Sequence, residues 1–208
     1  MQEIGDRYIR IYKVHVEMVR SEKMKRVIFL DIDGVLNSNF WNGSHQKEIS
    51  DGTLIDAEKV KLLGALVKKT NAKIILHSGW KYWFGKKLQP LRPEAENLSV
   101  MFAKEDLSLE DITPDHSTEE IRRSKKFSLV KADEILAWLE GHKDIDSWIV
   151  IDDLDLHSEE IAMHQVKTDP SVGLTIDDVY KAEKMLMNSN YKRCDDNGRA
   201  EDGQPGSI

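Results

Sequence analysis

Two aspartates, Asp31 and Asp33, directly follow an apolar run in the stretch RVIFLDIDGVLNS. The run from Val27 to Leu30 is typical of a fully buried β-strand. A carboxylate at the end of such a strand is costly to bury unless a cation lies beside it. Carboxylates of this kind can bind a metal ion, attack an electrophile or exchange a proton, so both residues are candidates for a site.

Polar residues also follow two other short apolar runs. They are Ser78 and Gly79 in KIILHSG (73–79), and Asp152 and Asp153 in WIVIDD (148–153). Parallel strands place their carboxyl ends at one edge of a sheet, and ligands of open α/β sheets bind outside that edge. Each group alone also fits a turn or an acidic loop. The convergence of three strand ends is what favours a site.

The segments between these runs predict helices. Apolar spacing predicts helices over 56–69, 131–141 and 175–186, and a weaker strand over 163–168. Gly141 is a candidate for the residue just past the second helix, and Thr175 is a candidate N-cap for the third. Short apolar strands alternating with amphipathic helices indicate an α/β fold, with a mostly parallel sheet covered by helices on both faces.

Composition and patterning along the 208 residues predict the domain organisation. We expect an N-terminal extension over 1–25, which includes a possible extra strand in YIRIYKVHV, and one domain over 26–188. The polar residues 189–208 predict a disordered tail. The net charge of −7 argues against general nucleic-acid binding by the whole molecule, but it leaves room for a local basic patch.

The same composition bears on the compartment. Cys194 is the only cysteine, which excludes an intrachain disulfide and fits a reducing environment. The charged N-terminus lacks the apolar run of a signal peptide, and no apolar stretch is long enough for a membrane span. We therefore expect a cytoplasmic protein with no membrane partner, and the sequence gives no indication of its oligomeric state.

Taken in order, DIDGV, HSG, a lysine and IDD resemble the motifs of the haloacid dehalogenase (HAD) superfamily of phosphohydrolases. The resemblance is closest to the HAD domain described in Swiss Army Knife RNA repair proteins, and it covers about residues 26–187, including SGW, KADEILAWL and VKTDPSVGLT. It implies a Rossmann-like core, and the short segment between Gly34 and residue 56 leaves room for a minimal cap or none. It also implies a Mg²⁺-dependent phosphatase that works through an aspartyl-phosphate.

The resemblance implies a role for each site residue. Asp31 would be the nucleophile, and Asp33 the general acid and base. The phosphate would be bound by Gly34, Ser78, Gly79, Trp80 and Lys131, and Mg²⁺ by Asp31, the backbone carbonyl of Asp33, Asp152 and Asp153. Asp153 would act directly, through water or by orienting its neighbour, and Asp155 is a poorer candidate.

A lysine is needed to neutralise charge on the phosphoryl group. Lys125, Lys126 and Lys131 are the candidates. Lys131 opens the helix that leads into WIVIDD, where the family places its basic residue, so we favour it. The alternative is that Lys131 lies in a solvated first turn.

Other functions use similar residues. A receiver-type phosphoaspartate signalling module also has clustered aspartates, a hydroxyl residue and a lysine. In a receiver, however, the acceptor is a lone aspartate after a middle strand and the hydroxyl residue comes later, whereas here Ser78 ends the next strand after the D-x-D pair. A true dehalogenase is disfavoured by Asp33, because a halide needs no acid to leave. A phosphotransferase such as a mutase stays open, although the segment between Gly34 and residue 56 is too short for a large cap.

The stretch WKYWFGKKLQPLRP (80–93) suggests the substrate. It contains Lys81, Lys86, Lys87 and Arg92 with no acidic residue, and RRSKK (122–126) adds a second basic cluster. The interleaved aromatic residues are Trp80, Tyr82, Trp83 and Phe84, which either stack bases or pack beneath the rim. We expect a phosphorylated substrate, with a terminal phosphate of RNA or DNA as the hypothesis, and a phosphoprotein or small metabolite as alternatives.

Overall fold

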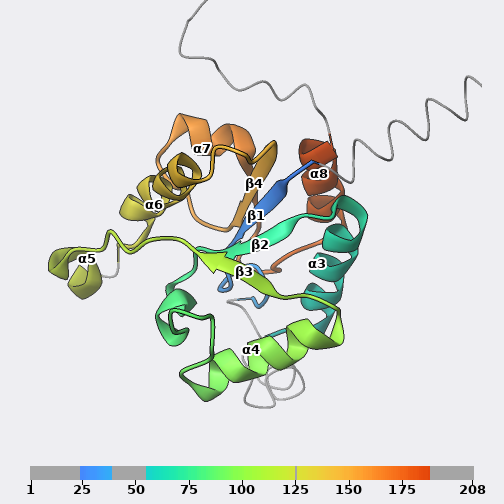
Figure 1. Cartoon of the computed structure of the whole chain (residues 1–208), viewed down its shortest axis with the longest axis horizontal. Coiled ribbons are helices and arrows are strands. Elements are labelled where there is room, and N and C mark those ends of the chain that lie inside the picture. The colour runs from blue at the N-terminus through green and yellow to red at the C-terminus, as the bar shows by residue number, and fades with distance from the viewer. Residues whose placement is uncertain (1–23, 39–54, 125, 188–208) are drawn as a thin grey trace, which may run out of the picture.

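A computed structural model describes residues 24–38, 55–124 and 126–187, and its strands form one parallel sheet (Figure 1). They are β1 (Arg26–Leu30), β2 (Lys73–Leu76), β3 (Leu109–Ile112), β4 (Ser147–Asp152) and β5 (Gln165–Lys167), in the order β3-β2-β1-β4-β5. Every neighbouring pair is parallel. The predicted α/β fold is therefore confirmed. Of the weak strand predicted over 163–168, only β5 forms.

The helices are α3 (Ala57–Thr70), α4 (Pro93–Lys104), α5 (Glu119–Ser124), α6 (Ser128–Gly141), α7 (Glu159–His164) and α8 (Ile176–Met187), with a 3-10 helix, η1 (Gly79–Trp83). Of these, α3, α6 and α8 match the three predicted helices. Thr175 caps α8 as expected, accepting from the Asp178 N–H at 3.2 Å. The prediction for Gly141 was wrong, because this residue is the last one of α6 and His142 is the C-cap.

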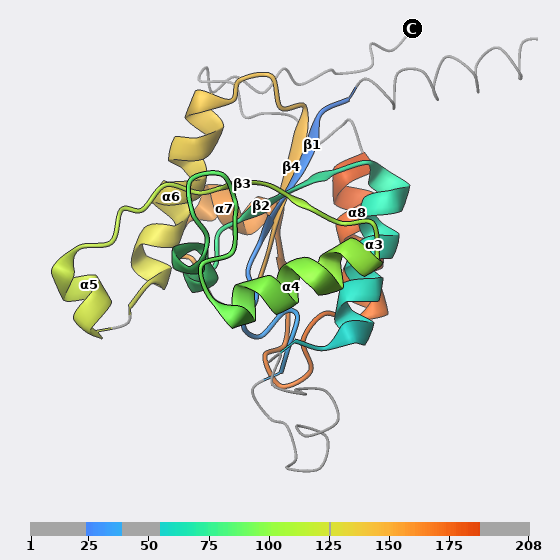
Figure 2. The same ribbon diagram turned by 60° about the horizontal axis from the view of Figure 1, so that its bottom comes forward.

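Helices cover both faces of the sheet because the side chains of a strand alternate between them. Ile28 and Leu30 of β1 belong to a core cluster that α3, α4 and α8 complete. Val27 and Phe29 face the other way, into a cluster with α6 and α7. Figure 2 shows the sheet between these two groups of helices. Both faces of β1 are buried, which explains its unbroken apolar run.

The strand order brings the expected strand ends together. The chain moves outward from β1 through β2 to β3, and then returns to place β4 on the other side of β1. Hydrogen bonds continue just beyond the strands: the Asp31 N–H donates to Ile151 O and the His77 N–H donates to Leu30 O, both at 3.0 Å. The carboxyl ends of β1, β2 and β4 are thus fixed side by side at a topological switch point.

Several predictions concern residues outside this description. Residues 1–23 and 188–208 lie beyond it, so the extension, its possible strand and the disordered tail stay predictions. Residues 39–54, where a cap could be inserted after β1, also lie outside. Among the helices of the described ranges, none combines the length and apolar character needed to cross a membrane.

At the amino end of β1, opposite the carboxyl ends that carry Asp31, Ser78 and Asp152, Arg26 connects the ends of two helices. Its side chain is buried at the start of β1, where Nε donates to Leu186 O at 3.2 Å and a terminal nitrogen donates to Thr70 O at 3.1 Å. These carbonyls lie in the last turns of α8 and α3, where a positive charge is favourable. The guanidinium thereby holds both helices against the central strand.

Replacing Arg26 with methionine should lower the free energy of unfolding by about 1–3 kcal/mol, because two carbonyls lose a charged donor. Urea denaturation measures this change. The matched control is Lys25→Met, because the neighbouring Lys25 is an exposed residue whose ion pair with Asp144 lies on the surface. An equal loss in both variants would contradict the role assigned to Arg26.

Candidate active site

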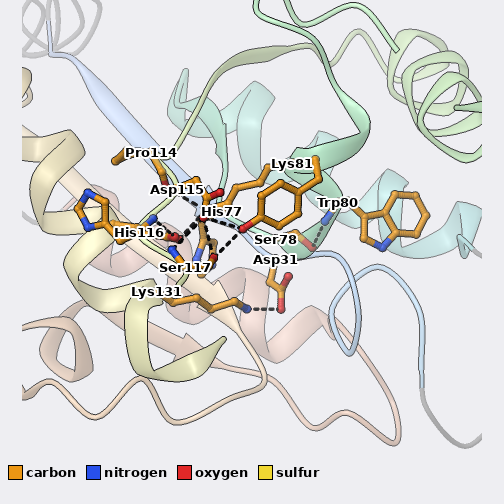
Figure 3. A network of polar contacts seen from close by, with 12 residues as sticks. Asp31, His77, Ser78, Trp80, Lys81, Pro114, Asp115, His116, Ser117 and Lys131 are labelled. Carbon is orange, nitrogen blue, oxygen red and sulfur yellow. Dashed lines mark hydrogen bonds and ion pairs between the residues drawn. The ribbon is translucent and has the colours of Figure 1, made fainter. Parts of the chain in front are cut away.

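One buried lysine joins two of the three strand ends. Lys131 Nζ donates to Asp31 Oδ2 and to Asp152 Oδ2, both at 2.7 Å (Figure 3 shows the contact with Asp31). Asp31 follows β1, Asp152 ends β4, and Lys131 lies in the first turn of α6. All three are buried. The cation that the buried carboxylates require is therefore Lys131.

The two carboxyl groups differ in their electrostatic environment. Burial alone would raise the pKa of Asp31, but the charge of Lys131 and hydrogen bonds from Lys131 and Ser78 hold it below its usual range. Burial, followed by the negative charge of Asp31, raises the pKa of Asp152, and Lys131 offsets this only in part. Environments that push two pKa values apart give the groups different roles. Asp31 is the one kept ionised, as a nucleophile requires.

An acidic cluster lies around Asp31. One carboxylate oxygen from each of Asp31, Asp152 and Asp153 lies within 4.8 Å of the others. The cluster offers only oxygen ligands, which suit a hard cation such as Mg²⁺ rather than zinc. Asp153 is half-buried, and burial followed by the charge of Asp31 raises its pKa. Three of the four predicted metal ligands are thus brought together by their side chains.

Gly34 makes room for Asp153. Its φ is +75°, and a Cβ at this position would lie 2.5 Å from Asp153 Cγ. The prediction that Gly34 allows a turn whose backbone N–H groups approach the phosphate stays a prediction, and the Gly34 N–H itself donates to Asn37 Oδ1 at 2.8 Å. The backbone N–H of Gly34 therefore binds the side chain of Asn37. Because Gly34 has no side chain, Asp153 can lie against this turn as part of the acidic cluster.

The side chain of Asp33 lies apart from the acidic cluster. Asp33 is exposed, and its two oxygens accept from Trp80 Nε1 at 3.0 Å and from Asn37 Nδ2 at 2.9 Å. Trp80 was predicted to bind the phosphate or its substrate, but the ring is buried and contributes to the core. The buried ring is therefore not a free surface for base stacking, and its indole N–H orients Asp33, whereas the phosphate contact of Trp80 stays a prediction.

Ser78 and His77 follow β2 and are both buried. Ser78 caps η1, accepting from the Trp80 N–H at 3.3 Å, and its hydroxyl contributes to lowering the pKa of Asp31. His77 was not predicted to belong to the site, yet Nε2 lies 3.2 Å from Asp152 Oδ2. Burial and then the charge of Lys131 lower the pKa of His77 to about 3, so the ring is neutral. Its position beside Ser78 was the available signal.

The other predicted phosphate-binding positions differ in exposure. Gly79 is exposed, and a Cβ there would meet nothing within 4 Å. Of the competing lysines, Lys126 is exposed and Lys125 lies outside the described residues. Lys131 is the one whose ammonium contacts Asp31, so the geometry agrees with the predicted choice.

The basic stretch 80–93 is only partly a free surface. Lys81 is buried, and its Nζ donates to Glu134 Oε2 at 2.6 Å and to Pro114 O at 2.9 Å. The prediction that this lysine faces a nucleic acid was therefore wrong. The exposed cations of this stretch are Lys86, Lys87 and Arg92.

The aromatic residues of the stretch also pack inward for the most part. Phe84 is buried in the core, as Trp80 is, and Trp83 packs against Trp80 with 4.5 Å between ring centroids. Tyr82 is more exposed, and its hydroxyl bonds to Asp115. Of the two alternatives for these rings, packing into the protein beneath the carboxyl ends of the strands is the one observed for Trp80, Trp83 and Phe84.

The second basic cluster is partly neutralised by its neighbours. Arg122 on α5 donates to Asp115 Oδ2 at 2.6 Å, and Arg123 pairs with Glu119 at 3.5 Å. These contacts are exposed, and surface pairs of this kind contribute little to stability. They nevertheless reduce the positive charge that the cluster presents.

The fold and this site define an α/β domain in which an aspartate, a serine, a lysine and an acidic cluster lie at the carboxyl ends of the parallel strands. The sequence profile described as "HAD domain in Swiss Army Knife RNA repair proteins" matches residues 27–179, and the chain belongs to this family of the HAD superfamily. The predicted resemblance is thereby confirmed. Searches of curated proteins and of solved structures found no match to the chain.

The two glycines of the site provide a matched pair of variants. Gly34→Ala should lower the free energy of unfolding by about 1–3 kcal/mol, because the left-handed backbone is strained and the new Cβ displaces Asp153. Gly79→Ala adds the same methyl group in open space, so its stability should stay within about 0.5 kcal/mol of wild type. Urea denaturation compares them. Indistinguishable midpoints would refute the steric role of Gly34.

Proposed function

We propose that this chain is a Mg²⁺-dependent phosphatase that hydrolyses a phosphate monoester through an aspartyl-phosphate on Asp31. The observation that carries this proposal is the contact of Lys131 with both Asp31 and Asp152 at 2.7 Å, beside the hydroxyl of Ser78. An ionised carboxylate next to a fixed cation can accept a phosphoryl group whose negative oxygens the cation stabilises. Membership of the HAD family supports this reaction class.

The reaction has two steps. An Asp31 oxygen attacks phosphorus, the bond to the leaving oxygen breaks, and Asp33 donates a proton to that oxygen. A water then attacks the phosphorus of the aspartyl-phosphate, gives its proton to Asp33 and releases phosphate, which restores Asp31. Ser78 and Lys131 donate to the phosphoryl oxygens in both steps.

The acidic cluster is the metal site that we propose. Asp31, Asp152 and Asp153 would bind Mg²⁺, together with the backbone carbonyl of Asp33. When bound, the ion would neutralise charge on the phosphoryl oxygens and reduce their repulsion of the attacking group.

The position of Asp33 favours a phosphatase over a receiver-type signalling module. A phosphatase needs an acid and base that both a leaving alcohol and water can reach. Asp33 is exposed, and Trp80 and Asn37 hold its carboxylate near the strand end that carries Asp31. A receiver, which releases its phosphate slowly, has no need of such a group.

We further propose a terminal phosphate of RNA or DNA as the substrate, with a phosphoprotein or a small metabolite as alternatives. Lys86, Lys87 and Arg92 are exposed in the loop between η1 and α4. The segment made of η1 and this loop follows the carboxyl end of β2 and enters the N-terminus of α4, and we propose that the loop borders the active site. Exposed cations at such a position attract polyanions. The RNA repair context of the family supports the same class.

Asp31→Asn should reduce kcat on an aryl phosphate by at least ~10³, because the amide cannot attack phosphorus. The assay measures initial rates with MgCl₂, and circular dichroism verifies the fold. Asp155→Asn is the control, since Asp155 is exposed and should keep wild-type turnover. A variant at Asp31 that keeps more than a tenth of the wild-type kcat would refute the nucleophile.

Lys86→Ala/Lys87→Ala should lower kcat/KM on a 5′- or 3′-phosphorylated oligonucleotide, with a salt slope shallower by about 0.7 for each lost phosphate contact. Turnover of a small aryl phosphate should change little. The control is Lys68→Ala/Lys104→Ala, which removes the same charge from the last turns of α3 and α4, at the other edge of the sheet. Equal responses from both double variants, or from both substrates, would contradict the nucleic-acid assignment.

A further inference from the structure

A second buried ion pair lies beside the site and has no part in the proposed chemistry. Lys81 Nζ and Glu134 Oε2 are 2.6 Å apart, and the side chains are 6% and 2% exposed. Burying two charges costs much of what their attraction returns, so a buried pair is weak evidence of a stabilising role. Its position in the fold offers a different explanation.

The pair joins the two elements that carry the proposed phosphate ligands. Lys81 lies one turn after Ser78 in η1, and Glu134 lies one turn after Lys131 on the same side of α6. The elements η1 and α6 belong to different crossovers of the sheet and are far apart in the sequence. The ion pair is therefore a direct bond between the supports of Ser78 and Lys131.

The remaining polar atoms of the pair are also satisfied, and by the same segment. Lys81 Nζ donates to Pro114 O at 2.9 Å, and Glu134 Oε1 accepts from the His116 N–H at 2.9 Å. The segment after β3 is thus tied to both η1 and α6, and Figure 3 labels Pro114 and His116 of this segment together with Lys81 of η1. A fully satisfied buried network restricts its members to one arrangement.

A pocket lies between these elements. Its lining includes Ser78 and Lys131 as well as Lys81 and Glu134, with Tyr82 and Phe127 among the other residues. Lys81 directs its ammonium to Glu134 and a backbone carbonyl, so it does not serve as a phosphate ligand. Its influence on a phosphoryl group would be exerted through the position of Ser78.

We infer that the Lys81–Glu134 pair is a positioning pair that fixes the separation of Ser78 and Lys131 and thereby sets the affinity for the phosphoryl group. This inference rests on the proposed function, in which both residues bind that group. Misplacement of a ligand by about 1 Å is enough to cost up to about 100-fold in a reaction. The pair acts on geometry and does not contact the substrate.

Two variants break the pair in different ways. Glu134→Gln keeps the shape and an acceptor oxygen but removes the charge, whereas Lys81→Met/Glu134→Leu replaces both charges with apolar groups, a change that folded proteins often tolerate. Isothermal titration with inorganic phosphate, in the presence of MgCl₂, should give a dissociation constant about 10- to 100-fold above wild type in both. The KM for an aryl phosphate should rise in parallel.

The variant Arg26→Met distinguishes a positioning role of the Lys81–Glu134 pair from a general effect of lost stability. Arg26 is buried at the opposite edge of the sheet, so this variant should lose stability in urea while keeping the wild-type dissociation constant for phosphate. The inference is overturned if the folded pair variants bind phosphate as wild type does. It is also overturned if Arg26→Met weakens binding equally, or if neither pair variant folds.

The failure of the proposed function gives a different result. A wild-type chain that binds phosphate but turns over no monoester would contradict the phosphatase, while the dissociation constants would still decide the role of the pair. A wild-type chain that turns over aryl phosphate, with pair variants that do so equally well, would overturn the positioning role alone. A wild-type chain that binds no phosphate would overturn both.

Discussion

The contact of Lys131 with Asp31 and Asp152 is the constraint on which the site depends. Two carboxylates at the ends of adjacent strands repel each other and lose hydration when they are buried, so neither position is tolerable without a cation between them. The lysine can reach them only if the first turn of α6 lies above the carboxyl ends of β1 and β4. The crossover from β3 to β4 must therefore pass over this point of the sheet, so an electrostatic requirement and the topology agree.

Around this contact, the acidic residues are separated by their surroundings. Asp31 and Asp152 are buried with the lysine, Asp153 is half-buried beside Gly34, and Asp33 is held on the exposed side by Trp80 and Asn37. Acids of one chemical type can divide nucleophile, metal ligand and proton carrier among them only when their environments differ. The core contributes directly to the different surroundings of these acids, because Trp80, whose N–H orients Asp33, is itself a core residue.

The elements with the strongest local pattern could be predicted from the sequence. The strands β1, β2 and β4 are continuous apolar runs because both faces are covered, and their ends located Asp31, Ser78 and Asp152. The strand β3 reads LEDI and lies at the edge of the sheet with its side chains half-buried or exposed, so no apolar run marks it. Helix α4 lies in residues 80–127, where the sequence indicates one or two possible helices but not their bounds.

Contacts between remote residues could not be read from the sequence. Lys81 lies in a stretch of exposed basic residues, and the sequence around it gives no sign that it is buried. Its partner Glu134 is remote in the sequence and contacts it only in the fold. His77 lacks a ligand spacing and enters the site only because β2 and β4 end on either side of β1. Trp80 combines an aromatic side chain with a position next to Ser78, which suggested a stacking surface. The sheet instead turns this ring into the core and leaves its N–H beside Asp33.

The burial of β1 on both faces couples the core to the chemistry through strand register. In the observed register Ile28 lies opposite Ile74 and Ile149, and Asp31 leaves the strand toward Lys131. A slip of one residue would exchange the side chains of the two hydrophobic cores and turn Asp31 away from its cation. An insertion or deletion within β1 therefore cannot damage packing and spare catalysis, or the reverse. Only the register that buries both apolar faces of β1 also brings Asp31 into contact with Lys131.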